Sequence, residues 1–319
     1  MYLRPKLKFM NFLLIIGGLV LLILGGNWLL KSAVALSLKL EIPKIVIGMT
    51  VVSFATSAPE LIVSINAALS GSSDLALGNV IGSNIANLGL VLGITLLLGT
   101  MHVQKSFYKV DWPVMMIASA MLYFFLAGDN VIGQYEGIIL FSFLVIFLIY
   151  LLRFQKTAVL DELPEDDEPL PLFKIVLFLV IGGLGLWGGS ELLIKGATSL
   201  AQEFGVSERI IGVTVVSIGT SVPELAASII AVLKKEKAIS LGNLIGSNVF
   251  NILAVLGITS IITPVAVKDQ GLLTNDIFWM LAISFAVLPL VFIPKGYRLN
   301  WKDGIILLIA YVAFIYQTI

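Results

Sequence analysis

The sequence of 319 residues has no cysteine, one histidine and few charged side chains. Without cysteine, the chain forms no disulfide and has no thiolate to act as a nucleophile or metal ligand. The single histidine, His102, lies in a short polar connection with Lys105 and Lys109, where we expect a solvated side chain without a catalytic role. The formal net charge is zero, so the composition gives no indication of nucleic-acid binding.

Charge is scarce because the chain is apolar along most of its length. Asp, Glu, Lys and Arg make up 13% of the residues, against about 25% in soluble domains, and the mean hydropathy is +1.03. Apolar segments close to the ~20 residues that a spanning helix needs follow one another. We therefore predict an all-α integral membrane protein in a lipid bilayer. Its ten predicted transmembrane helices are 11–36, 43–69, 75–99, 112–127, 136–152, 174–200, 208–233, 239–263, 275–293 and 303–317.

The ten segments form two sets of five that repeat in sequence. A shift of 164 residues aligns 47–95 with 211–259 without a gap, and 28 of the 49 positions are identical. Such identity implies two similarly folded halves. Each half has an odd number of spans, so the second half enters the membrane from the opposite side and the repeat is inverted. Inverted repeats are typical of secondary transporters, in which discontinuous helices meet at the bilayer midplane.

One strongly polar stretch divides the two sets. The first five-helix repeat is 1–153, a linker covers 154–173, and the second repeat is 174–319. Clustered acids and prolines in the linker are typical of a solvated connection. With both termini outside and the linker in the cytoplasm, the inner side carries 14 Lys and Arg residues and the outer side six. This excess inside predicts a multi-pass protein of the plasma (inner) membrane in that orientation.

The first repeated motif places a carboxylate inside an apolar run. It reads Thr-Ser-x-Pro-Glu in both halves and ends at Glu60 and Glu224. A charged side chain at membrane depth is costly, so both glutamates are candidate functional residues. On a helix, Ser53 and Ser57 share one face with Glu60. The proline before each glutamate removes a backbone hydrogen bond and frees a carbonyl oxygen nearby.

The second repeated motif reads Gly-Asn-x-Ile-Gly-Ser-Asn-x-x-Asn and ends at Asn87 and Asn251. Its first asparagine, its serine and its last asparagine recur every four residues and therefore lie on one helix face. The glycines leave an adjacent face without side chains, so another helix can pack closely there. We expect the glycines to serve packing. Asn87 and Asn251 are expected to be ligands, because each half also contributes a carboxylate.

Together the motifs supply two carboxylates, several hydroxyls, amide oxygens and freed backbone carbonyls. Such an all-oxygen set suits hard cations, Ca²⁺ above all and Na⁺ by the same reasoning. Two glutamates are neutralised by one Ca²⁺ or by a pair of Na⁺ ions. One pocket can therefore hold either load but not both, which is what exchange requires.

The paired motifs resemble the two α-repeats of the sodium/calcium exchanger family within the cation/calcium antiporter superfamily, and nearly the whole chain resembles the compact prokaryotic members. The resemblance implies a secondary active antiporter that exchanges Na⁺ for Ca²⁺ through a single midplane site by alternating access, with no cofactor. In the family, the motif threonine and the residue three before it contribute through backbone carbonyls. The implied cation ligands are Ser53, Thr56, Ser57, Glu60, Ser83, Asn87, Ser217, Thr220, Ser221, Glu224, Ser247 and Asn251.

Three alternatives remain at this point. Coupling to H⁺ is the first, although calcium/proton exchangers have Gly-Asn-Ala-x-Glu at the acid. A cation channel also needs midplane oxygens, but a two-acid cage at a repeat interface argues against it. An intramembrane enzyme would have almost no residues to carry a reaction. Some family members, including potassium-dependent ones, have aspartate at the position of Asn251, so the amide here argues against potassium co-transport. The oligomeric state is open, with a monomer allowed.

Overall fold

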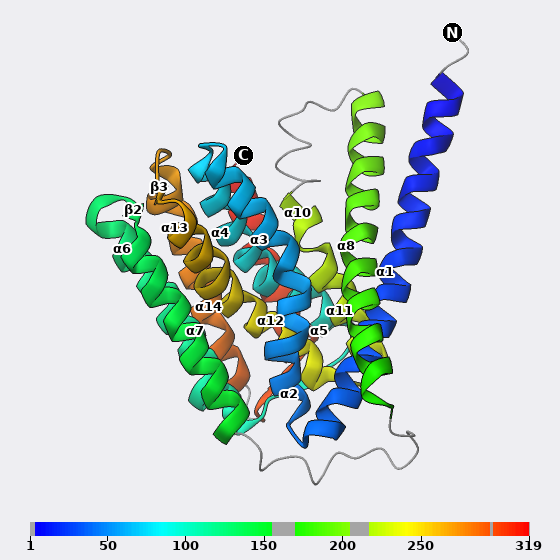
Figure 1. Ribbon diagram of the computed structural model, residues 1–319, viewed down its shortest axis with the longest axis horizontal. Helices are drawn as coiled ribbons and strands as arrows, with labels where there is room; N and C mark the ends of the chain where they lie inside the picture. Colours follow the sequence, from blue (N-terminus) through cyan, green and yellow to red (C-terminus); the bar gives the residue numbers. More distant parts are fainter. Residues whose placement is uncertain (1–3, 155–169, 205–216, 294–295, 319) are drawn as a thin grey trace.

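The computed structural model describes residues 4–154, 170–204, 217–293 and 296–318, which form a bundle of helices (Figure 1). Within these ranges, eight helices are long and apolar enough to cross a membrane, so the chain is an all-α multi-pass membrane protein. The spans predicted at 112–127 and 136–152 are longer than expected, covering Phe107–Asp129 and Gln134–Phe154. They gain length because helical turns continue into the polar and aromatic residues at their ends, which suits the membrane interface.

The first half begins with one long helix and continues with shorter helices. π-Helical segments join α2 to α3 and α4 to α5, and a third such segment precedes α6. Its elements are α1 (Arg4–Leu40), α2 (Lys44–Ile47), η1 (Gly48–Val52), α3 (Ser53–Leu69), α4 (Ser73–Ala86), η2 (Asn87–Val91), α5 (Leu92–Leu98), β1 (Met101–His102), η3 (Phe107–Asp111), α6 (Trp112–Asp129), β2 (Val131–Ile132) and α7 (Gln134–Phe154).

The second half repeats this order. Its described elements are α8 (Leu172–Glu203), α10 (Ser217–Thr220), α11 (Val222–Leu233), α12 (Lys237–Phe250), η6 (Asn251–Leu256), α13 (Gly257–Ile262), β3 (Val265–Ala266), η7 (Leu272–Asp276), α14 (Ile277–Phe292), β4 (Arg298–Leu299) and α15 (Trp301–Thr318). Two short antiparallel strand pairs, β1 with β4 and β2 with β3, each join one half to the other.

The helices that carry the second motif lie at the centre of the bundle. Most residues of α4 and α12 are buried, whereas α1, α7 and α8 expose many large apolar side chains, as expected for contact with lipid. Asn87 begins the π-helical segment η2 and Asn251 begins η6. Single π-helical segments within α-helices are frequent at functional sites. Both asparagines predicted as ligands therefore occupy equivalent irregular positions in the protein core.

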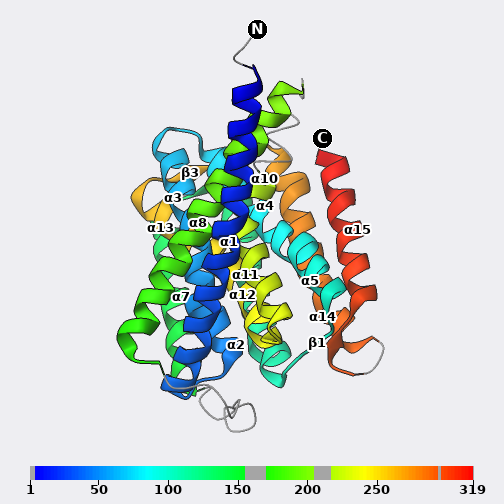
Figure 2. The same cartoon turned by 90° about the vertical axis from the view of Figure 1, so that its right-hand side faces the viewer.

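The long helices α1 and α8 lie side by side at one edge of the bundle (Figures 1 and 2). They run antiparallel, because contacts pair rising residue numbers in α1 with falling numbers in α8. Glycine makes the close approach feasible: a Cβ on Gly18 would lie 2.7 Å from the Gly189 carbonyl oxygen, and one on Gly25 would lie 2.7 Å from the Leu186 nitrogen. Small residues at such crossings let two membrane helices pack backbone to backbone.

The prediction of discontinuous helices is wrong for the first half and correct for the second. In the first half, α3 runs through Pro59 without interruption. In the second half, α10 ends at Thr220, Ser221 has non-helical dihedral angles, and Pro223 lies at the start of α11. The residue four before the proline, whose carbonyl the proline leaves unpaired, is Ala55 in the first half but Gly219 in the second. Alanine favours the helix more than glycine does, by about 1 kcal/mol, which accounts for the difference.

Some predicted features lie outside the described residues. These are residues 155–169 of the acidic linker, residues 205–216, which include the start of the aligned repeat in the second half, and residues 1–3 and 319 at the ends of the chain.

Candidate cation site

Glu60 and Glu224 are the two buried carboxylates of the motif. Glu60 lies in the middle of α3, Glu224 lies in the first turn of α11, and both are fully buried at 0% exposure. Ser57, three residues before Glu60 in α3, places its Oγ 3.5 Å from Glu224 Oε1, so the two glutamates belong to the same part of the interface between the halves. In the described part of the chain neither forms a salt bridge, and no group of three or more His, Cys, Asp or Glu side chains occurs. A buried pair of ionised carboxylates without a basic partner is costly unless a cation or protons neutralise it.

Several oxygen atoms of the predicted ligands are buried and have no hydrogen-bond partner among the described residues. Buried polar atoms are normally paired, so a group of unpaired ones requires an explanation. Five of the twelve predicted ligands contribute such atoms. The unpaired atoms are Glu60 Oε1 and Oε2, Glu224 Oε2, Asn87 Oδ1, Asn251 Oδ1 and Ser221 Oγ.

Hydroxyl groups of the first half face the carboxylate of the second. Ser57 Oγ lies 3.5 Å from Glu224 Oε1, and the hydroxyls of Thr56 and Ser247 also interact with this carboxylate. The Thr56 and Ser247 hydroxyls lie 3.3 Å apart, although they are 191 residues apart in the chain. Residues that were predicted from separate copies of the motif therefore meet at the interface between the two halves.

The two asparagines predicted as ligands are held through their amide nitrogens. Asn87 Nδ2 donates to Asn248 Oδ1 at 3.2 Å, and Asn251 Nδ2 donates to Ser83 Oγ at 2.9 Å and to Asn84 Oδ1 at 3.1 Å. With the nitrogen ends engaged, the Oδ1 atoms are left to accept from or coordinate another group. Carbonyl-type oxygens in this state are suitable ligands for hard cations.

The hydroxyl of Ser53 interacts with the protein backbone. Its Oγ donates toward two backbone carbonyls, those of Gly48 at 2.8 Å and Asn243 at 2.9 Å, and so connects η1 to α12. Ser53 could still contribute its own carbonyl, as the family resemblance implies. Thr220 is half-buried at the end of α10. Ser217 begins α10, and its side chain lies outside the described part of the structure.

The packing role expected for the glycines is confirmed in the second half. A Cβ on Gly242 would lie 3.1 Å from the Met49 nitrogen, and a Cβ on Gly246 would lie 2.6 Å from the Met49 carbonyl oxygen. The close contact of α12 with η1 therefore depends on glycine at both positions. It brings the second motif of one half against the first motif of the other.

Four asparagines outside the predicted ligand set hold this arrangement together. Asn79 donates to Ser64 Oγ at 3.0 Å within the first half, and Asn243 accepts from Thr56 at 3.1 Å across the interface. Asn84 Oδ1 accepts from Asn251, and Asn248 Oδ1 accepts from Asn87. All four belong to the repeated motif, and their recurrence in both halves was the signal that marked them.

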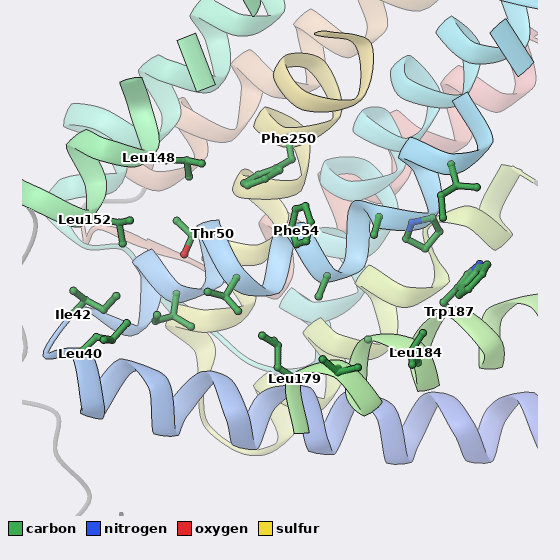
Figure 3. Close-up of a pocket in the computed structure, with 18 residues that line it drawn as sticks. Leu40, Ile42, Thr50, Phe54, Leu148, Leu152, Leu179, Leu184, Trp187 and Phe250 are labelled. Carbon is green, nitrogen blue, oxygen red and sulfur yellow. The ribbon is translucent and has the colours of Figure 1, made fainter. Parts of the chain in front are cut away.

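A separate cavity of about 660 Å³ lies on another side of α3 and is lined by apolar residues from α1, α3, α7, α8 and α12 (Figure 3). Phe54, Leu148, Leu179 and Trp187 are among its walls. The only hydroxyl in the lining, that of Thr50, donates to the backbone carbonyl of Val46 at 2.7 Å. None of the predicted ligands lines this cavity, so it is distinct from the candidate cation site.

Comparison with known proteins agrees with the geometry. The sequence pattern of the family described as "Sodium/calcium exchanger protein" matches residues 10–153 and 174–319. The chain is 39% identical over 306 residues to "Putative antiporter CaxA" of Alkalimonas amylolytica, covering 94% of this chain and 95% of that protein. It is 31% identical over 348 aligned positions to the sodium/calcium exchanger MaX1 of Methanosarcina acetivorans, covering 96% and 97%.

A solved structure of the sodium-calcium exchanger NCX_Mj superimposes with a TM-score of 0.83 at 26% identity and covers 96% of this chain and 98% of that one. Family members are transporters, and these likenesses support a cation/Ca²⁺ antiporter of compact prokaryotic type. The chain belongs to the sodium/calcium exchanger protein family.

Proposed function

We propose that this protein exchanges Na⁺ for Ca²⁺ across the membrane through one site between its two halves. The observation that carries the proposal is the group of unpaired buried oxygens on Glu60, Glu224, Asn87, Asn251 and Ser221. Every one of these atoms can coordinate a hard cation, and two belong to the same carboxylate. A cation at this position would relieve both the unpaired acceptors and the repulsion between the glutamates.

The proposed ligands follow from how each side chain is engaged. The unpaired oxygens named above would bind directly, together with the hydroxyls of Ser57, Ser83 and Ser247. Ser53 and Thr56 would contribute backbone carbonyls, as the family resemblance implies. Ser217 and Thr220 are assigned the equivalent carbonyl role in the second half.

Charge balance favours exchange over simple binding. Two ionised glutamates are neutralised by one Ca²⁺, or by Na⁺ ions bound one to each carboxylate. An empty site leaves two like charges buried at 0% exposure, which is the costliest state of the three. The protein therefore changes its exposure to the two sides most readily when a cation load is bound, which couples the two ion fluxes.

Alternating access is proposed to rest on ten transmembrane helices in an inverted five-plus-five repeat. Three observations support this arrangement. The corresponding helices α1 and α8 run antiparallel. The strand β1 after α5 pairs with β4 after α14, and β3 after α13 pairs with β2 after α6, so the two strand pairs are related to each other by the repeat. The Arg4 end of α1 lies at the same end of the bundle as the Thr318 end of α15 (Figures 1 and 2). In inverted-repeat transporters, one group of helices moves relative to the rest around a central site. The peripheral α1–α8 pair is the candidate moving element.

The proposed setting is the plasma (inner) membrane, with both termini outside and the acidic linker in the cytoplasm. The excess of Lys and Arg in the predicted inner connections supports this orientation.

The test is Ca²⁺ uptake into proteoliposomes that are loaded with Na⁺ and diluted into Na⁺-free buffer containing ⁴⁵Ca²⁺. We expect uptake that depends on the outward Na⁺ gradient and is abolished in Glu60→Gln and Glu224→Gln. Glu41→Gln, which removes a carboxylate from an exposed turn, is the matched control and should transport normally. Uptake that follows a pH gradient and ignores Na⁺ would instead establish H⁺ coupling, and uptake without any counter-ion would indicate a channel.

A further inference from the structure

Four buried asparagines form a hydrogen-bonded network across the interface between the halves. Asn84 Nδ2 donates to the Asn248 carbonyl and Asn248 Nδ2 donates to the Asn84 carbonyl, both at 3.3 Å. Asn84 Oδ1 accepts from Asn251 at 3.1 Å, and Asn248 Oδ1 accepts from Asn87 at 3.2 Å. All four side chains are at most 1% exposed. Each half thus supplies one asparagine predicted as a ligand, Asn87 or Asn251. It also supplies one asparagine, Asn84 or Asn248, whose Oδ1 accepts from the predicted ligand of the other half.

An asparagine amide has one end that accepts and one that donates, and only the accepting end can coordinate a cation. Which end faces the site is decided by the hydrogen bonds around the amide. Asn84 and Asn248 present oxygens to the nitrogens of Asn251 and Asn87, and this leaves both Oδ1 atoms unpaired. If either amide turned over, it would direct N–H groups toward a cation and repel it.

We propose that Asn84 and Asn248 are positioning residues for ion binding: neither coordinates the cation, but each fixes the orientation of the opposite half's asparagine so that its oxygen faces the site. The inference rests on the proposed function and extends it to two residues outside the predicted ligand set. Each positioning residue is itself anchored by its amide donating to the other's backbone. The side chains of Asn84 and Asn248 thus have both their amide ends hydrogen-bonded in a buried network, and such networks fix side-chain orientation strongly.

The two predicted asparagine ligands do not depend equally on this network. Asn251 has a second acceptor, because its Nδ2 also lies 2.9 Å from Ser83 Oγ. For Asn87, the acceptor found within the described ranges is Asn248 alone. Removing the side-chain oxygen at 248 should therefore weaken ion binding more than removing it at 84.

The experiment measures KM for Ca²⁺ and Vmax of Na⁺-driven uptake in proteoliposomes, and the Ca²⁺-induced rise in Tm of the purified protein. Asn248→Leu removes the acceptor, Asn248→Asp keeps an oxygen facing Asn87, and Asn84→Leu is the matched substitution in the other half. We expect Asn248→Leu to raise KM on the order of tenfold, which corresponds to the loss of about one hydrogen bond. Asn248→Asp should restore a KM near that of the wild type, and Asn84→Leu should have the smaller effect.

Asn248→Ser serves as a less disruptive second variant, since its short hydroxyl leaves Asn87 without the acceptor while keeping a small polar group. If Asn248→Leu does not fold, a raised KM in Asn248→Ser supports the proposal. A wild-type KM and a wild-type Ca²⁺-induced Tm rise in either folded variant overturn it, as does equal loss in Asn248→Asp and Asn248→Leu. Absence of Na⁺-driven uptake in the wild-type protein would contradict the proposed function instead, so the two failures are distinguishable.

Discussion

The Asn251 amide nitrogen lies 2.9 Å from Ser83 Oγ across the interface between the two halves, although the two residues are 168 positions apart in sequence. The Asn251 side-chain oxygen has no partner among the described residues. Asn251 is therefore a neutral group at the edge of a site that already holds two carboxylates. This neutrality sets the charge that the bound cations must balance.

The substitution Asn251→Asp should convert a balanced site into one with a surplus negative charge. With Ca²⁺ bound, the site would carry a net charge of −1 rather than zero. We expect the KM for Ca²⁺ to fall and Vmax to fall roughly tenfold, because a more tightly held ion leaves more slowly. Initial rates of ⁴⁵Ca²⁺ uptake over a range of Ca²⁺ concentrations measure both. Asn66→Asp, which adds the same charge at an exposed position near the end of α3, should leave both values unchanged.

The contact between α1 and α8 gives a prediction about stability. A Cβ on Gly189 would lie 2.8 Å from the Gly18 carbonyl oxygen and from the Leu22 nitrogen, whereas a Cβ on the neighbouring Gly188 would meet no atom within 4 Å. Gly189→Ala should therefore force the helices apart and lower the free energy of unfolding by about 1–3 kcal/mol. Gly188→Ala should leave it unchanged or raise it by up to ~1 kcal/mol, because alanine favours a helix.

Thermal unfolding of the two glycine variants in the same detergent tests this directly. Transport should also be slower in Gly189→Ala if the α1–α8 pair moves as a unit. Equal Tm values for the two variants would show that the helices are not in backbone contact.

The Ser53 hydroxyl gives a prediction that separates a structural role from ion coordination. It interacts with the backbone carbonyls of Gly48 and Asn243, so Ser53→Ala should destabilise the contact between η1 and α12 by about 1–2 kcal/mol. The KM for Ca²⁺ should stay within about twofold of the wild type, since no ligand atom is lost. Ser119→Ala, in which the lost hydroxyl binds only Met115 of its own helix, is the control for removing a buried serine. A large rise in KM with an unchanged Tm would instead make the Ser53 hydroxyl a ligand.

The sequence predicted the eight long apolar helices of the described residues, because such helices depend on local pattern. Apolar runs locate the helices, and the repeated motif marked Glu60, Glu224, Asn87 and Asn251 before their positions in space were known. The contact between Thr56 and Ser247 could be inferred only through the repeat, which implied that two distant copies meet.

Other features depend on contacts that local pattern does not carry. The unbroken helix at Pro59 reflects the balance between a missing hydrogen bond, the helix propensity of Ala55 and the packing of α3, and the sequence does not show the packing. The network of four asparagines requires one half to face the other in a particular register. The engagement of the Ser53 hydroxyl likewise depends on how closely α12 approaches η1, which the glycines permit but do not determine.

The central claim is that Glu60 and Glu224 form one site that Ca²⁺ and Na⁺ share. Equilibrium binding of ⁴⁵Ca²⁺ to the purified protein, titrated with Na⁺ at constant ionic strength, tests it most directly. We predict one Ca²⁺ bound per chain, displaced cooperatively by Na⁺, and loss of binding in either Glu60→Gln or Glu224→Gln. Ca²⁺ that stays bound at saturating Na⁺, or one of the two variants that binds Ca²⁺ like the wild type, would contradict a single shared site.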